Sequence, residues 1–159
     1  FLDNSEISQI LDTYNLVDSY SIFKRYPSSI NIKINKTKFL AKVNKNGNNF
    51  FLGSNGKIIK AEEEKIEVPF IFGDFNFKEF IILKKIIEDS NFNYKEIRNF
   101  YFFPSGRWDL ETQSGLLIKL PKNDIKENFD LFLKIFDNEK FNKIKMIDFR
   151  QSNQVIIDE

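Results

Sequence analysis

Two carboxylates, Asp109 and Glu111, are the residues whose spacing best suits chemistry. They lie two positions apart in RWDLETQ, a segment whose pattern predicts a β-strand, so both side chains should share one face of a sheet. Such a pair could hold a divalent cation or act as a general acid and a general base. A hard cation needs more oxygen ligands than two carboxylates supply, and the neighbouring sequence offers no others. A solvated strand face explains the pair more simply, and a carboxylate-based enzyme stays the alternative.

The composition removes most other catalytic chemistry. The 159 residues contain no histidine and no cysteine, which excludes His-based triads, thiolate zinc sites and disulfides. The glycines at 47, 53 and 56 fall in asparagine-rich turns with no helix start after them, so they predict no phosphate-binding loop. A hydrolase built on carboxylates remains possible, but the usual catalytic triads do not.

Charge and hydropathy exclude two further classes of partner. The net charge is +1, from 24 basic and 23 acidic residues, so no field favours nucleic acid. The longest apolar runs, such as VPFIF and FIIL, fall far short of the ~20 residues of a membrane span. The chain starts at Phe1 rather than Met, from which we expect it to be a piece of a longer protein.

The elements that must position these residues follow an α+β pattern of three helices and eight to ten short strands. Apolar residues at helical spacing predict helices starting near residue 4, over 77–89, and from about 124 to 136. Asn76 with Glu79, and Asp124 with Glu127, match the capping-box pattern at the second and third helix starts. A helix–strand–strand unit ends near residue 43 and is too small to be a complete domain.

Turn residues divide the strands. Alternating apolar residues predict a hairpin whose strands are residues 17–26 and 30–38, and Asn-Gly pairs at 46–47 and 55–56 predict two more tight turns. Trp108 suits either a sheet core or an interface anchor, with the core favoured. After a turn at 152–153, residues 154–157 form a last strand, which is either an open sheet edge or one protected by Asp158 and Glu159.

Several phrases, in order along the chain, resemble the periplasmic part of the FtsQ/DivIB cell-division family. KRYPSSINIKI, followed by FLAKV, resembles the strand that closes the family's small POTRA domain, with Ala41 at a usual alanine. NGNNFFLGSNGKII is similar to the start of its second, β domain, and VPFIFGD to its Pro-apolar-x-Gly phrase. SGRWDLETQSGLLIKL is similar to a core hairpin, and MIDFRQ to a Val-Asp-Leu-Arg-Tyr strand in which Gln151 replaces the Tyr.

The resemblance implies the domain organisation. Residues 1–43 would be the C-terminal part of a POTRA domain whose first strand and helix precede Phe1. Residues 44–159 would form the FtsQ-type β domain, mostly antiparallel, with two helices. The whole protein would be a single-pass protein of the cell inner membrane, with its span upstream of Phe1 and the present region in the periplasm.

The resemblance also implies a function without catalysis, so we expect no catalytic residue, no metal site and no cofactor. The family is a divisome scaffold that links early to late division proteins and binds the FtsB–FtsL pair, while other divisome proteins meet its POTRA part. The contact with FtsB–FtsL is made where a partner segment adds a strand to the terminal sheet edge. The matching turn residues here are Arg150, Gln151, Ser152 and Asn153, and the matching edge residues are Gln154, Val155, Ile156 and Ile157.

Two alternatives stay open. A carboxylate-based cell-wall enzyme would use Asp109 and Glu111, and its turnover of peptidoglycan would disappear in an Asp109→Asn variant. A POTRA module of a secretion or assembly system would show tandem POTRA repeats and a C-terminal barrel, neither of which these residues contain.

Overall fold

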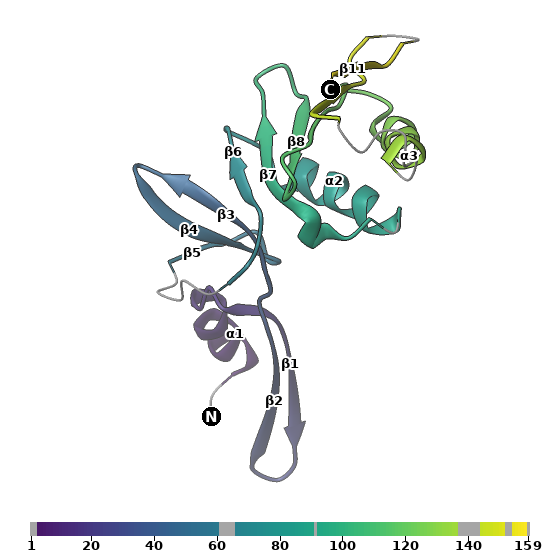
Figure 1. Cartoon of the computed structure of the whole chain (residues 1–159). Helices are drawn as coiled ribbons and strands as arrows, with labels where there is room; N and C mark the ends of the chain where they lie inside the picture. The colour runs from purple at the N-terminus through teal and green to yellow at the C-terminus, as the bar shows by residue number, and fades with distance from the viewer. Residues whose placement is uncertain (1–2, 61–65, 91, 137–143, 152–153, 159) are drawn as a thin grey trace. The chain divides into compact units, whose positions relative to one another are not determined.

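A computed structural model describes residues 3–60, 66–90, 92–136, 144–151 and 154–158 of the chain (Figure 1). The chain divides into two compact units, Phe1–Ile66 and Glu67–Glu159. The combination of helices with a sheet of mixed strand directions confirms the predicted α+β class. Assignment of residues 1–43 to a POTRA domain stays a prediction.

The first unit holds one helix and two antiparallel groups of strands. Helix α1 (Asn4–Thr13) begins where predicted, with Asp3 and Glu6 forming its capping box. The hairpin pairs β1 (Val17–Arg25) with β2 (Ser29–Lys36), as its alternating pattern predicts. The second group pairs β3 (Phe39–Lys45) with β4 (Asn48–Gly53), and β4 with β5 (Ile58–Ile59).

Asparagine side chains and glycine fix the turns of this unit. Asn46 and Gly47 have φ values of 52° and 81°, the left-handed backbone that an Asn-Gly turn requires. At the next turn, Asn55 Nδ2 lies 2.9 Å from the Asn15 carbonyl oxygen and 2.9 Å from Thr37 Oγ1. One asparagine therefore ties the β4–β5 turn to the residues just before β1 and just after β2.

The second unit contains one sheet with the strand order β6-β7-β8-β9-β10-β11. Its strands are β6 (Phe70–Phe72), β7 (Ile97–Phe102), β8 (Trp108–Thr112), β9 (Leu117–Lys119), β10 (Met146–Asp148) and β11 (Ile156–Asp158). The β7–β8, β8–β9 and β10–β11 pairs are antiparallel, whereas β6–β7 and β9–β10 are parallel. The two parallel pairs require crossovers, and helices α2 (Phe77–Asp89) and α3 (Ile125–Phe136) supply them.

One face of this sheet forms the core. Residues paired across the strands make a row that is 0 to 2% exposed: Ile71, Phe100, Leu110, Ile118 and Ile147. Helix α2 covers this face, and its Phe80 ring meets Phe100 edge-on at 5.6 Å. Helix α3 packs beside α2. Trp108, 2% exposed, lies in the same core, which confirms the core interpretation over an interface anchor.

Three details differ from the sequence predictions. Asn76 caps α2 through the Lys78 amide, but no return bond from Glu79 accompanies it in the described region. Asp124 has a φ of 56°, and neither its side chain nor that of Glu127 makes a capping bond among the described residues, so the predicted Asp124 capping box is wrong. The last strand covers Ile156–Asp158 rather than 154–157. The predicted turn at 152–153 lies outside the described residues.

No helix within the described ranges is long and apolar enough to cross a membrane. This agrees with the sequence, in which the longest apolar runs are only as long as a buried strand or part of a helix.

Trp108→Ala should lower the free energy of unfolding of the second unit by about 3–5 kcal/mol, because it removes a buried ring and leaves a cavity. Urea denaturation followed by far-UV circular dichroism measures this without needing tryptophan fluorescence. Ile82→Ala is the matched control, since Ile82 on α2 is 59% exposed and should change stability by at most about 0.5 kcal/mol. Equal losses in both variants would contradict the assignment of Trp108 to the core.

Candidate partner-binding site

The end of the chain forms a sheet edge. β11 pairs with β10 on one side and is the last strand in the sheet order of the described residues. Ile156 and Ile157 are 40% and 36% exposed, although both are large apolar residues. Such an exposed apolar edge is the kind of surface to which a partner strand can add.

The direction of the main-chain groups along β11 follows from the neighbouring strands. The Lys145 carbonyl oxygen accepts from the Leu117 amide, and the Phe149 amide donates to the Lys119 carbonyl oxygen, so Ile147 between them turns its main chain toward β9. The main-chain groups of Met146 and Asp148 then face β11, because these groups alternate along a strand. Their partners Asp158 and Ile156 face β10 in return.

Ile157, between those two partners, therefore turns its N–H and C=O away from β10. Val155 has the same parity and precedes the strand directly. The Asp158 carbonyl oxygen, which accepts from Lys145 at 2.8 Å, agrees with this assignment. The outer edge thus offers the main-chain groups of alternate residues to a partner.

Arg150 is held by an acidic neighbour at the end of β10. Its Nε donates to Asp148 Oδ1 at 2.8 Å, its Nη2 donates to Asp148 Oδ2, and its backbone amide also donates to Oδ1. These bonds lower the pKa of the buried Asp148 carboxyl and raise the pKa of Arg150. The guanidinium is thus oriented in advance, with Nη1 left for a further acceptor.

Arg150 and Gln151 also border a polar groove of about 480 Å³. The loop between β9 and α3 supplies the opposite side with Lys122, Asn123 and Asp124. The parallel pairing of β9 with β10 causes this meeting, because parallel strands end at the same edge of a sheet. Lys122 and Asn123 were not among the predicted partner-binding residues, because the sequence does not show that β9 and β10 pair in parallel.

Not every selected residue can be located. Ser152 and Asn153 lie outside the described residues. Gln154 is exposed and Val155 is half-buried, both directly before β11. Which of the eight selected residues contact a partner remains a prediction.

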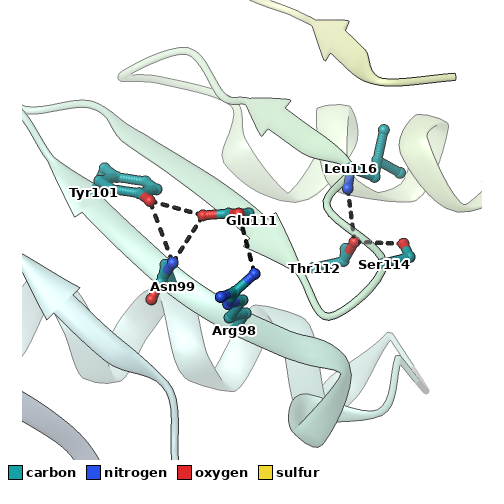
Figure 2. A network of polar contacts seen from close by, with 7 residues as sticks. All are labelled: Arg98, Asn99, Tyr101, Glu111, Thr112, Ser114 and Leu116. Atoms are coloured by element: carbon teal, nitrogen blue, oxygen red, sulfur yellow. Dashed lines mark hydrogen bonds and ion pairs between the residues drawn. The ribbon is translucent and has the colours of Figure 1, made fainter. Parts of the chain in front are cut away.

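Asp109 and Glu111 share one face of β8, as their spacing predicts. Figure 2 shows Glu111 at the centre of a polar network, with Asn99 Nδ2 and the Tyr101 hydroxyl each donating to its Oε2 at 2.7 Å. The Arg98 guanidinium approaches its other oxygen at 4.0 Å. The bonds from Asn99 and Tyr101 hold the pKa of Glu111 below its usual value.

Asp109 is buried rather than solvated, so the interpretation of the pair as a solvated strand face is wrong for this residue. It is 4% exposed, and its Oδ1 has no hydrogen-bond partner among the described residues. Burial raises the pKa of Asp109, against the opposing charges of Arg107, Arg150 and Lys119. Nowhere in the described ranges do three or more acidic side chains gather in a way that could hold a metal ion.

The turn after β8 is fixed by two hydroxyl groups. Thr112 Oγ1 lies 2.8 Å from Ser114 Oγ and accepts from the Leu116 amide at 3.1 Å (Figure 2). Gly115 has a φ of 89°, which suits glycine at this position. These bonds set the register in which β9 returns beside Asp109 and Glu111.

Comparison with protein families gives one decisive result. The family described as "Cell division protein FtsQ/DivIB, C-terminal" matches residues 41–150, more than half of the chain. The chain belongs to the FtsQ/DivIB family. A comparison with curated proteins gave no significant match.

Membership in the FtsQ/DivIB family gives this chain a role in cell division, in company with other division proteins. The matched range runs from within β3 to Arg150, so it includes the whole of β7–β10 and the Asp148–Arg150 pair. β11 follows the matched range. The geometry of the edge strand is therefore read from this chain's own structure rather than carried over from the match.

Asp109→Asn should raise the melting temperature at pH 7. A raised folded-state pKa means that ionised Asp109 costs stability above that pKa, and that the cost disappears as pH falls toward the unfolded pKa. The difference from wild type should therefore shrink between pH 7 and pH 4 in thermal unfolding followed by circular dichroism. Asp130→Asn, at an exposed carboxylate on α3, should show no such trend. A lower melting temperature for Asp109→Asn at pH 7 would contradict the burial cost.

Proposed function

We propose that this chain is a non-enzymatic scaffold of the bacterial divisome that binds the FtsB–FtsL pair through its C-terminal β edge. The observation that carries the proposal is the outer edge of β11, in a chain of the FtsQ/DivIB family. The scaffold would link early to late division proteins. This region would lie in the periplasm, attached to the inner membrane by an upstream span.

The edge supports strand addition in two ways. The main-chain groups of Ile157 point away from β10, and an incoming strand that continued past the end of β11 would pair with those of Val155 as well. The side chains of Ile156 and Ile157 lie on opposite faces of that strand, so a partner could cover apolar surface above and below the sheet. A strand with a flanking helix would reach the standard interface of about 1,600 Å².

Arg150 supports the same location. Its guanidinium is fixed by Asp148 and borders the polar groove beside Gln151 and Lys122. The groove also carries Asp124, but the oriented guanidinium of Arg150 and the nearby Lys122 would suit a partner that presents an acidic side chain beside its added strand.

The proposal also covers the remaining parts of the chain. Residues 1–43 would be the end of a POTRA domain, and the β1–β2 hairpin carries Ile30, Ile32 and Ile34 exposed along β2, which suits a face that other parts of such a domain cover. Other divisome proteins would contact this part. No cofactor or metal belongs to the proposed function.

Val155→Pro should weaken binding of the FtsB–FtsL pair about tenfold or more while the sheet core stays folded. Proline removes an outward N–H and disfavours the backbone that an added strand needs, and each lost hydrogen bond costs about 1 kcal/mol. Isothermal titration calorimetry against the purified pair measures the affinity.

Val155→Ala is the matched control, because it trims the same side chain but keeps the main-chain donor, and its affinity should stay within about threefold of wild type. Undiminished binding by Val155→Pro would show that this edge is not the contact.

Arg150→Ala should weaken the same association several-fold at low salt and much less at high salt, because partly exposed charge pairs are screened. Arg150→Lys keeps the charge but loses the two-pronged contact with Asp148, and should lie between wild type and alanine. Affinities at about 50 and 500 mM salt test this. A loss that is the same at both salt concentrations would point to a disturbed β10 end instead of a lost charge pair.

A further inference from the structure

The sheet face opposite the core carries an ordered set of polar residues. Because side chains alternate along a strand, the neighbours of the buried row point to the other face. One row across the sheet on that face reads Tyr101, Asp109, Lys119 and Asp148 in successive strands. The adjacent row places Asn99 beside Glu111. This open face is distinct from both the helix-covered core and the β11 edge.

A groove of about 410 Å³ lies on this face over β7, β8 and β9. Both carboxylates of β8 line it, and its walls are aromatic and apolar. The lining residues are Tyr101, Phe103, Asp109, Glu111, Gly115 and Leu117. Its volume falls within the range of sites that hold a small ligand or a side chain.

Asp109 leaves an acceptor in this groove without a donor. Its Oδ1 is buried and unpartnered, although three cations lie close enough to act on its charge. Arg150 is engaged with Asp148, and the Arg107 guanidinium lies 4.4 Å from the centre of the Phe103 ring. A buried carboxylate oxygen without a donor costs free energy, so the site favours a donor from outside the chain.

The aromatic wall of the groove is held rigidly. The Tyr101 hydroxyl is fixed by Glu111 and Asn99, as Figure 2 shows, and its ring stacks on Phe72 at 5.2 Å. Aromatic faces attract cations, and two carboxylates two residues apart add charge to the same space. A rigid aromatic wall above an unpaired carboxylate is a surface suited to an ammonium or guanidinium group.

We propose that this groove binds the cationic side chain of a lysine or arginine from a partner protein. The cation donates to Asp109 Oδ1, its aliphatic stem lies against Tyr101 and Leu117, and Glu111 adds attraction while it holds Tyr101 in place. The site does not depend on strand addition at β11. It makes the open face a second contact surface, with a charge preference opposite to that of the groove beside Arg150.

The direct test uses Nα-acetyl-lysine methylamide and Nα-acetyl-arginine methylamide as probes of the ¹⁵N-labelled chain. Saturable chemical-shift changes are expected at amides of β7, β8 and β9, with millimolar dissociation constants. Nα-acetyl-norleucine methylamide has a similar stem without the charge, and it should cause no saturable change. Shifts that do not saturate, or equal binding of the norleucine probe, would overturn the proposal.

Variants localise the effect. Asp109→Asn and Glu111→Gln should each weaken binding of the lysine probe about fivefold or more, whereas Asp130→Asn on α3 should leave it unchanged. The dispersion of the amide spectrum shows whether each groove variant folds. If one of them does not fold, probe binding by the other still tests the site. Unchanged binding by a folded groove variant would refute the site. Val155→Pro should keep full probe binding, so failure of the edge and failure of the groove are separable.

Discussion

The architecture of the second unit depends on one packing constraint: both of its helices cover the same face of the sheet. Two parallel strand pairs, β6–β7 and β9–β10, each need a crossover, and α2 and α3 provide them side by side. The row from Ile71 to Ile147 then becomes the core, with five residues almost fully buried. Strand alternation places every neighbour of that row on the opposite face. The polar network, the groove and the Asp148–Arg150 pair all result from this single assignment of faces.

The same constraint explains why the functional surfaces lie where they do. The core-facing position on β11 is Ile157, which still aligns with Ile147 but is 36% exposed because the sheet ends there. A core row that runs out to an edge leaves apolar surface that the chain itself does not cover. A partner strand there would extend both the hydrogen bonding and the apolar row by one step. The family match supports a division role, and the edge is the surface that we propose for it.

Signals from neighbouring residues predicted much of the fold, whereas features that depend on the pairing of distant strands were not predicted. Helix α2 begins and ends where its apolar period and Asn76 place it, and the Asn46-Gly47 turn has the expected backbone, because both depend on neighbouring residues. The burial of Asp109 was missed because it depends on the flanking strands, which place Tyr101 on one side of it and Lys119 on the other. The position of Lys122 and Arg150 at one groove was missed for the same reason, since a sequence does not reveal that β9 and β10 run parallel.

The order of charges along the open face would limit how a partner aligns across the strands. Along the row, Asp109, Lys119 and Asp148 alternate in sign from strand to strand, and Arg150 pairs with Asp148 from the end of the same strand. A partner that crosses this face meets a fixed sequence of signs at the strand spacing of roughly 4.8 Å. Shifting such a partner by one strand would place like charges together, which costs free energy even where each single pair contributes little. For the proposed partner, such a row would select the register more than it would strengthen binding, while the backbone edge and the apolar side chains of β11 would supply the affinity.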